Sequence, residues 1–104
     1  MPSCANPQNR PPRDVVDRLI DEVAWAKTCM LITAATKPGS PERTREMAQL
    51  RQAVVKPRHA VDKILGQGQA VPREVLITLR TCELAIPKLE AGAVLRQPTE
   101  GGAV

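Results

Sequence analysis

The sequence predicts an all-α fold, a small antiparallel bundle of three helices. Apolar residues recur at spacings of three and four in three separate stretches, which is the pattern of amphipathic helices. Two segments rich in Pro and Gly, TKPGSP and GQGQAVP, separate these stretches. Links of about four to six residues normally join antiparallel neighbours. No stretch alternates apolar and polar residues for long enough to indicate strands.

The first helix is expected at about residues 14–36. Asp14 can cap its N-terminus, where a carboxylate also interacts favourably with the exposed backbone N–H groups of the first turn. The segment KPG at residues 37–39 ends it. Its apolar stripe consists of Val16, Leu19, Val23, Ala26 and Met30.

The second helix is expected at 41–65. Ser40 can accept a hydrogen bond from the first turn, and Pro41 occupies the first helical position, where its missing N–H is not needed. Pro57 lies inside the helix and removes one backbone hydrogen bond, so we expect a kink or a break into two helices there. The apolar seam consists of Met47, Leu50, Val54, Pro57, Val61 and Ile64.

The third helix is expected at 72–91, with a kink near Pro87. Its apolar positions are Val75, Leu79, Cys82, Ile86 and Leu89. The three helices together make residues 13–91 a single domain. The Pro-rich residues 1–12 are expected to be a disordered tail and the Gly-rich residues 92–104 a flexible one.

The composition suits one folded domain with an unusual core. The chain has 104 residues, which is enough to bury a real core, but it contains one Trp, no Phe and no Tyr. The core must therefore be built from Leu, Val, Ile, Met and Ala. Because aromatic side chains bury the largest areas, their scarcity leaves a thin margin of stability. Self-association would widen that margin.

The cysteines and the hydropathy pattern favour a cytoplasmic protein. Cys4, Cys29 and Cys82 are an odd number without close spacing, and the first thirty residues lack a secretory pattern, so we expect reduced thiols. The apolar run 23–35 contains Lys27 and is shorter than the roughly 20 residues that a membrane-spanning helix needs. We therefore expect no membrane insertion.

The first helix carries a second apolar line, formed by Trp25, Cys29 and Ile32. Two interpretations stay open. The helix could lie between the other two, so that both lines belong to the core, or this line could contact another chain, either a second copy or a different protein. The polar residues Arg18 and Asp21 continue the line, and Trp is enriched at interface hot spots. Trp25, Cys29 and Ile32 are therefore a candidate protein interface.

The second helix carries a basic face. The chain has a net charge of +4, and the middle segment holds most of the excess. Such a face can bind phosphates, although a solvated surface that happens to carry Lys and Arg is the simpler interpretation. The lack of Phe and Tyr lowers the odds of base stacking, and the apolar stretch REVLITLR does not suit a recognition helix. The candidate phosphate contacts are Arg43, Arg45, Arg51, Lys56, Arg58 and Lys63.

No residue pattern indicates catalysis, a metal or a cofactor. His59 is the single histidine, and the cysteines lack metal-ligand spacing. GQGQ lacks the Lys and Ser or Thr of a phosphate-binding loop. The sequence therefore favours a non-catalytic protein-interaction module with a regulatory or inhibitory role, which we expect to form a homo-oligomer or to bind another protein. The alternative is a helical protein that binds nucleic acid through the basic face.

Overall fold

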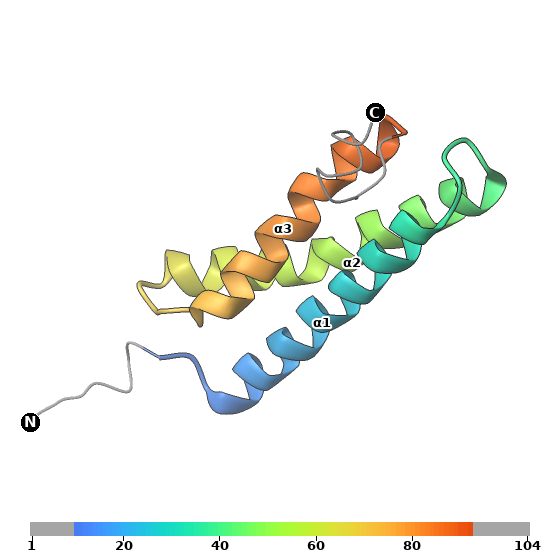
Figure 1. Ribbon diagram of the computed structural model, residues 1–104. Helices are drawn as coiled ribbons and strands as arrows, with labels where there is room; N and C mark the ends of the chain where they lie inside the picture. Colours follow the sequence, from blue (N-terminus) through green and yellow to red (C-terminus); the bar gives the residue numbers. More distant parts are fainter. Residues whose placement is uncertain (1–9, 93–104) are drawn as a thin grey trace, which may run out of the picture.

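The computed structural model describes residues 10–92, which form three mutually packed helices (Figure 1). These are α1 (Arg13–Ala35), α2 (Pro41–Gly66) and α3 (Arg73–Glu90), and the described residues contain no strand. Each helix contacts the other two. The prediction of an all-α three-helix bundle is confirmed. The tails expected at 1–12 and 92–104 lie mainly outside the described residues.

The helix ends follow the local signals with one exception. Ser40 caps α2 as expected, because its Oγ accepts from the backbone N–H of Arg43 at 3.1 Å. The expected Asp14 cap is wrong. The helix α1 begins at Arg13, and the carbonyl oxygen of Pro12 accepts from the N–H groups of Val15 and Val16 at 3.1 Å each. Asp14 instead lies in the first turn, where its charge still favours the helix N-terminus.

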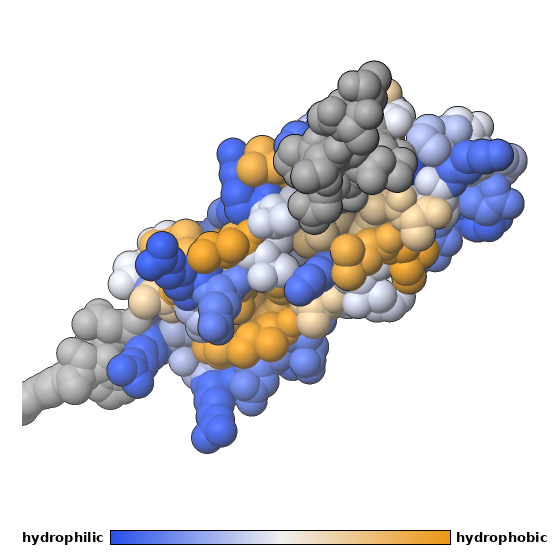
Figure 2. Space-filling view, in the orientation of Figure 1, coloured by the Kyte–Doolittle hydropathy of each residue, from blue (hydrophilic) through white to orange (hydrophobic). Residues whose placement is uncertain are grey.

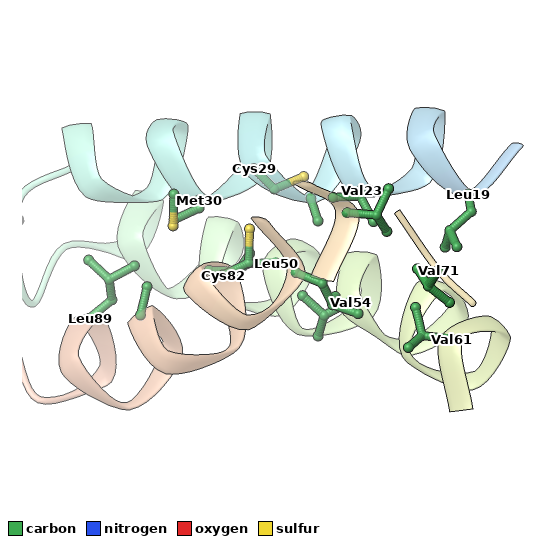
Figure 3. Close-up of a cluster of buried hydrophobic side chains, with 14 of the residues drawn as sticks. Leu19, Val23, Cys29, Met30, Leu50, Val54, Val61, Val71, Cys82 and Leu89 are labelled. Atoms are coloured by element: carbon green, nitrogen blue, oxygen red, sulfur yellow. The ribbon is translucent and has the colours of Figure 1, made fainter. Parts of the chain in front are cut away.

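The core is aliphatic and lies along the axis where the three helices meet (Figure 3). All three helices contribute to it at spacings of three and four, as the sequence pattern predicts. Both Cys29 and Cys82 belong to it as free thiols. The buried apolar residues are Leu19, Val23, Ala26, Cys29, Met30, Met47, Leu50, Val54, Val61, Ile64, Val71, Val75, Leu79, Cys82, Ala85 and Leu89.

Two prolines lie inside helices without breaking them. The helix α2 continues through Pro57, so the expected alternative of two helices placed end to end is wrong. Pro57 has no N–H to donate to the carbonyl of Ala53, but its ring is completely buried on the core side. Burial of that ring compensates in part for the lost hydrogen bond. The helix α3 likewise continues through Pro87, three residues before its last residue, Glu90.

Candidate interaction surface

The line of Trp25, Cys29 and Ile32 is divided between the surface and the core. Trp25 is 54% exposed and Ile32 is 43% exposed, whereas Cys29 is only 1% exposed. Four residues advance a helix by about 40° beyond one turn, and this rotation is enough to carry Cys29 under the neighbouring helix. Cys29 is therefore a core residue and cannot contact another chain, which corrects its assignment to the interface. Trp25 and Ile32 remain on the surface.

An open groove runs beside Trp25 between α1 and α2. Its volume is about 680 Å³. The small side chains of Ala48 and Ala53 on α2 leave this space opposite the indole. We call it the Trp25 groove. It is lined by Arg18, Asp21, Glu22, Trp25, Ala48, Gln49, Gln52, Ala53, Lys56 and Pro57.

The Trp25 groove continues into a second depression of about 700 Å³. The two share Arg18, Glu22 and Lys56, and the second extends to Val15 on α1 and Lys63 on α2. Residues near the start of α1 therefore lie level with residues near the end of α2. This is the register expected of two antiparallel helices joined by a short link.

The two edges of this surface carry opposite charge. Along α1, two acids and one base line this surface, namely Asp21 and Glu22 against Arg18. Along α2, Lys56 and Lys63 are both exposed and line the same surface. One edge is therefore acidic and the other is basic.

A second set of exposed apolar side chains lies over α1 and α3. Figure 2 shows apolar patches on the face that these two helices present. The exposed large apolar residues of these two helices include Ile20, Leu31, Ile77 and Leu84. This set was not predicted from the sequence, although the spacing of seven between Ile77 and Leu84 indicates that these two residues share one face of α3. Unlike Trp25, none of the four lines the grooves described above.

Arg43 is not part of a basic surface. The residue is buried, with only 4% of its surface exposed. Its Nη1 donates to the carbonyl oxygen of Leu89 at 3.0 Å, while Nε and Nη2 donate to Oγ1 and the carbonyl oxygen of Thr36 at 2.8 and 2.7 Å. The assignment of Arg43 to phosphate binding is therefore wrong. The guanidinium instead hydrogen-bonds the start of α2 to the ends of α1 and α3.

Arg51 and Arg58 are also engaged within the bundle. Arg51 pairs with Glu90 of α3. Arg58 donates from Nε to Oε2 of Glu83 at 2.7 Å and from Nη2 to Oε1 at 2.5 Å, and it also contacts Asp62. The hydrogen bond to Glu83 is the main reason that the pKa of Arg58 is raised above its ordinary value. Of the six candidate phosphate contacts, Arg45, Arg51, Lys56 and Lys63 are exposed, and Arg51 is the one of these four that is paired with Glu90.

The two core thiols are held in their protonated form. Burial is the main cause that raises the pKa of Cys82 above 9.0, and it does the same for Cys29. Within residues 10–92, no three His, Cys, Asp or Glu side chains gather in a way that could hold a metal ion. His59 is exposed on α2. Cys4 lies outside the described residues.

None of the helices in the described part of the chain has both the length and the apolar character that crossing a bilayer requires. Comparisons with protein-family models, with curated proteins and with solved structures gave no match for this chain.

Proposed function

We propose that this chain is a non-catalytic protein-interaction module that associates with a second copy of itself through the Trp25 groove. The observation that carries the proposal is the position of Trp25. It is the one aromatic side chain in the protein, yet it is half exposed at the edge of a groove, while the core is built without aromatic residues. Burying an indole against a partner removes a large apolar area from water, and Trp is enriched at interface hot spots.

The test compares two apolar residues of equal exposure on the same helix. Trp25→Ala removes the proposed anchor, and Leu31→Ala is its control, since Leu31 is 55% exposed on a different side of α1. We expect light scattering after size exclusion to give a mass above 11.3 kDa for the wild-type chain. Trp25→Ala should return the mass to 11.3 kDa with an unchanged helical circular dichroism spectrum, and Leu31→Ala should behave as wild type.

Two results would refute this proposal. One is a wild-type chain that stays monomeric at every concentration reached. The other is a loss of association in Leu31→Ala as large as that in Trp25→Ala, because a specific contact at Trp25 predicts a difference between the two variants.

Nucleic-acid binding through α2 is the alternative, with less support. Arg45, Lys56 and Lys63 remain exposed for phosphate contacts, while Arg43, Arg51 and Arg58 are bound to other groups of the bundle. Binding through phosphates weakens steeply as salt rises. A mobility-shift titration on mixed DNA and RNA at low salt separates the proposals, and we expect no shift. A shift that Lys56→Ala and Lys63→Ala abolish would favour the alternative.

A further inference from the structure

The Trp25 groove is self-complementary in charge. Its α1 edge is acidic through Asp21 and Glu22, which outweigh Arg18, and its α2 edge is basic through Lys56, with Lys63 in the adjoining depression. A partner that fits both edges must present a basic surface to α1 and an acidic one to α2. A second copy of this chain presents both, together with an apolar anchor at Trp25. A second copy of this chain is therefore a partner whose charges fit both edges of the Trp25 groove.

Symmetry decides which edges meet. A two-fold axis that runs parallel to the helices places α1 of one copy beside α2 of the other, so that acidic and basic edges face each other. A two-fold axis perpendicular to the helices would place α1 beside α1 and α2 beside α2, and like charges would then meet. Like charges brought together across an interface are unfavourable, so charge selects the first arrangement.

The parallel axis also fixes which residues pair. Rotation about such an axis does not move a residue along it, so each residue keeps its level on the helices. Glu22 and Arg18 lie level with Lys56 within one chain, because they line the same grooves. Asp21 of one copy is then level with Lys56 of the other. By the same reasoning Asp14 is level with Lys63, since Val15 and Lys63 line one depression.

We propose that two copies associate side by side about a two-fold axis parallel to the helices, with Asp21 of each copy paired with Lys56 of the other and Trp25 near the axis. This inference rests on the proposed function, and it adds the orientation of the two copies and the residues that pair between them. Each dimer contains the Asp21–Lys56 contact twice. The association is accordingly symmetric and closes at two chains.

The test uses charge reversal on separate chains. Lys56→Glu places two acids together at both contacts of its homodimer, and Asp21→Lys places two amines together, so each variant alone should associate about tenfold more weakly or worse. A mixture of the two variants is expected to recover nearly the wild-type affinity, because both contacts of the mixed dimer again join opposite charges. Sedimentation equilibrium of each variant and of the mixture measures this. Lys27→Glu, on the other side of α1, is the matched control and should leave the affinity unchanged.

The outcomes separate this inference from the proposed function. If wild type associates and Trp25→Ala does not, but the charge reversals have no effect, the arrangement is overturned and the proposed function stands. If each variant is weakened and the mixture does not recover, the effect lies within one chain and the arrangement is again overturned. A wild-type chain that never associates overturns both. Should Lys56→Glu fail to fold, Asp14→Lys and Lys63→Glu provide a second pair with the same expected recovery.

Discussion

Single buried polar groups hold the ends of this bundle together. Arg43 reaches from the first turn of α2 to Thr36 at the end of α1 and to Leu89 at the end of α3, and all three nitrogen atoms of its guanidinium donate. A planar fork can satisfy several backbone and hydroxyl acceptors at once, which a lysine cannot do. The packing of the start of α2 against the ends of α1 and α3 therefore depends on the Arg43 side chain.

Arg43→Ala should lower the free energy of unfolding by about 3 kcal/mol, because the hydrogen bonds of a buried charged donor to Thr36 and Leu89 are lost. Arg43→Lys should recover less than half of that loss. Urea unfolding followed by circular dichroism measures both. Arg80→Ala is the control, since its guanidinium is exposed and lies 3.9 Å from Glu83, and it should cost less than about 0.5 kcal/mol. A loss at Arg43 no larger than the control would contradict this account.

The buried thiol of Cys82 makes the stability depend on alkaline pH. Its pKa is raised in the folded state, chiefly by burial, above the ordinary value of 9.0 that applies to the unfolded chain. The folded state therefore keeps the proton when the unfolded state has lost it, so stability is full below pH 9 and falls as the pH rises through the raised pKa. Unfolding titrations at several alkaline pH values should show a shallower fall for Cys82→Ala than for wild type. Equal slopes would show that this thiol does not contribute.

At the scale of the helix, start and stop signals set the length of each element. Ser40 is the clearest case, because it both accepts from the N–H of Arg43 and donates to the carbonyl of Lys37 at 2.7 Å. Gly39 precedes it with φ of +81°, a conformation that a side chain would strain. In the link between α1 and α2, Gly39 thus allows the turn and Ser40 caps the helix that follows.

Ser40→Ala should lower the free energy of unfolding by about 1 kcal/mol, because the N–H groups at the start of α2 lose their acceptor. Ser40→Asp should restore most of the stability, since a carboxylate accepts the same hydrogen bond and carries a charge that favours a helix N-terminus. Thermal unfolding of the three proteins at one concentration makes the comparison. The account fails if Ser40→Asp is no more stable than Ser40→Ala.

The helices were predictable and the neighbours of individual side chains were not. Each helix bound lies within one residue of its expected position, because periodicity and Pro or Gly breakers are local properties of the chain. Whether Cys29 and Arg43 are buried depends on where the neighbouring helices lie around their own helix. Spacings of three and four do not carry that information. The groove beside Trp25 likewise needs Ala48 and Ala53 of another helix, so only its exposed anchor could be proposed from the sequence.

At the scale of the whole molecule, the distribution of aromatic area is the unusual feature. Most domains place their largest apolar side chains in the core, where each aromatic residue buries roughly 150–250 Å². Here the core is aliphatic and the single indole lies on the surface, half exposed beside a groove. An assembly that buries Trp25 would add the part of the aromatic contribution that folding of one chain leaves exposed to water.

Because the chain contains one Trp and no Tyr, its fluorescence reports on Trp25 alone. At low protein concentration we expect the emission of a water-exposed indole and easy quenching by iodide. As concentration rises, the emission should move to shorter wavelength and quenching should fall in step with the increase in mass, since association removes the indole from water. Lys56→Glu, which weakens the proposed dimer, should keep the exposed emission at concentrations where wild type has shifted. Mass that doubles while the emission of wild type stays unchanged would place the interface elsewhere, with the apolar residues over α1 and α3 as the next surface to test.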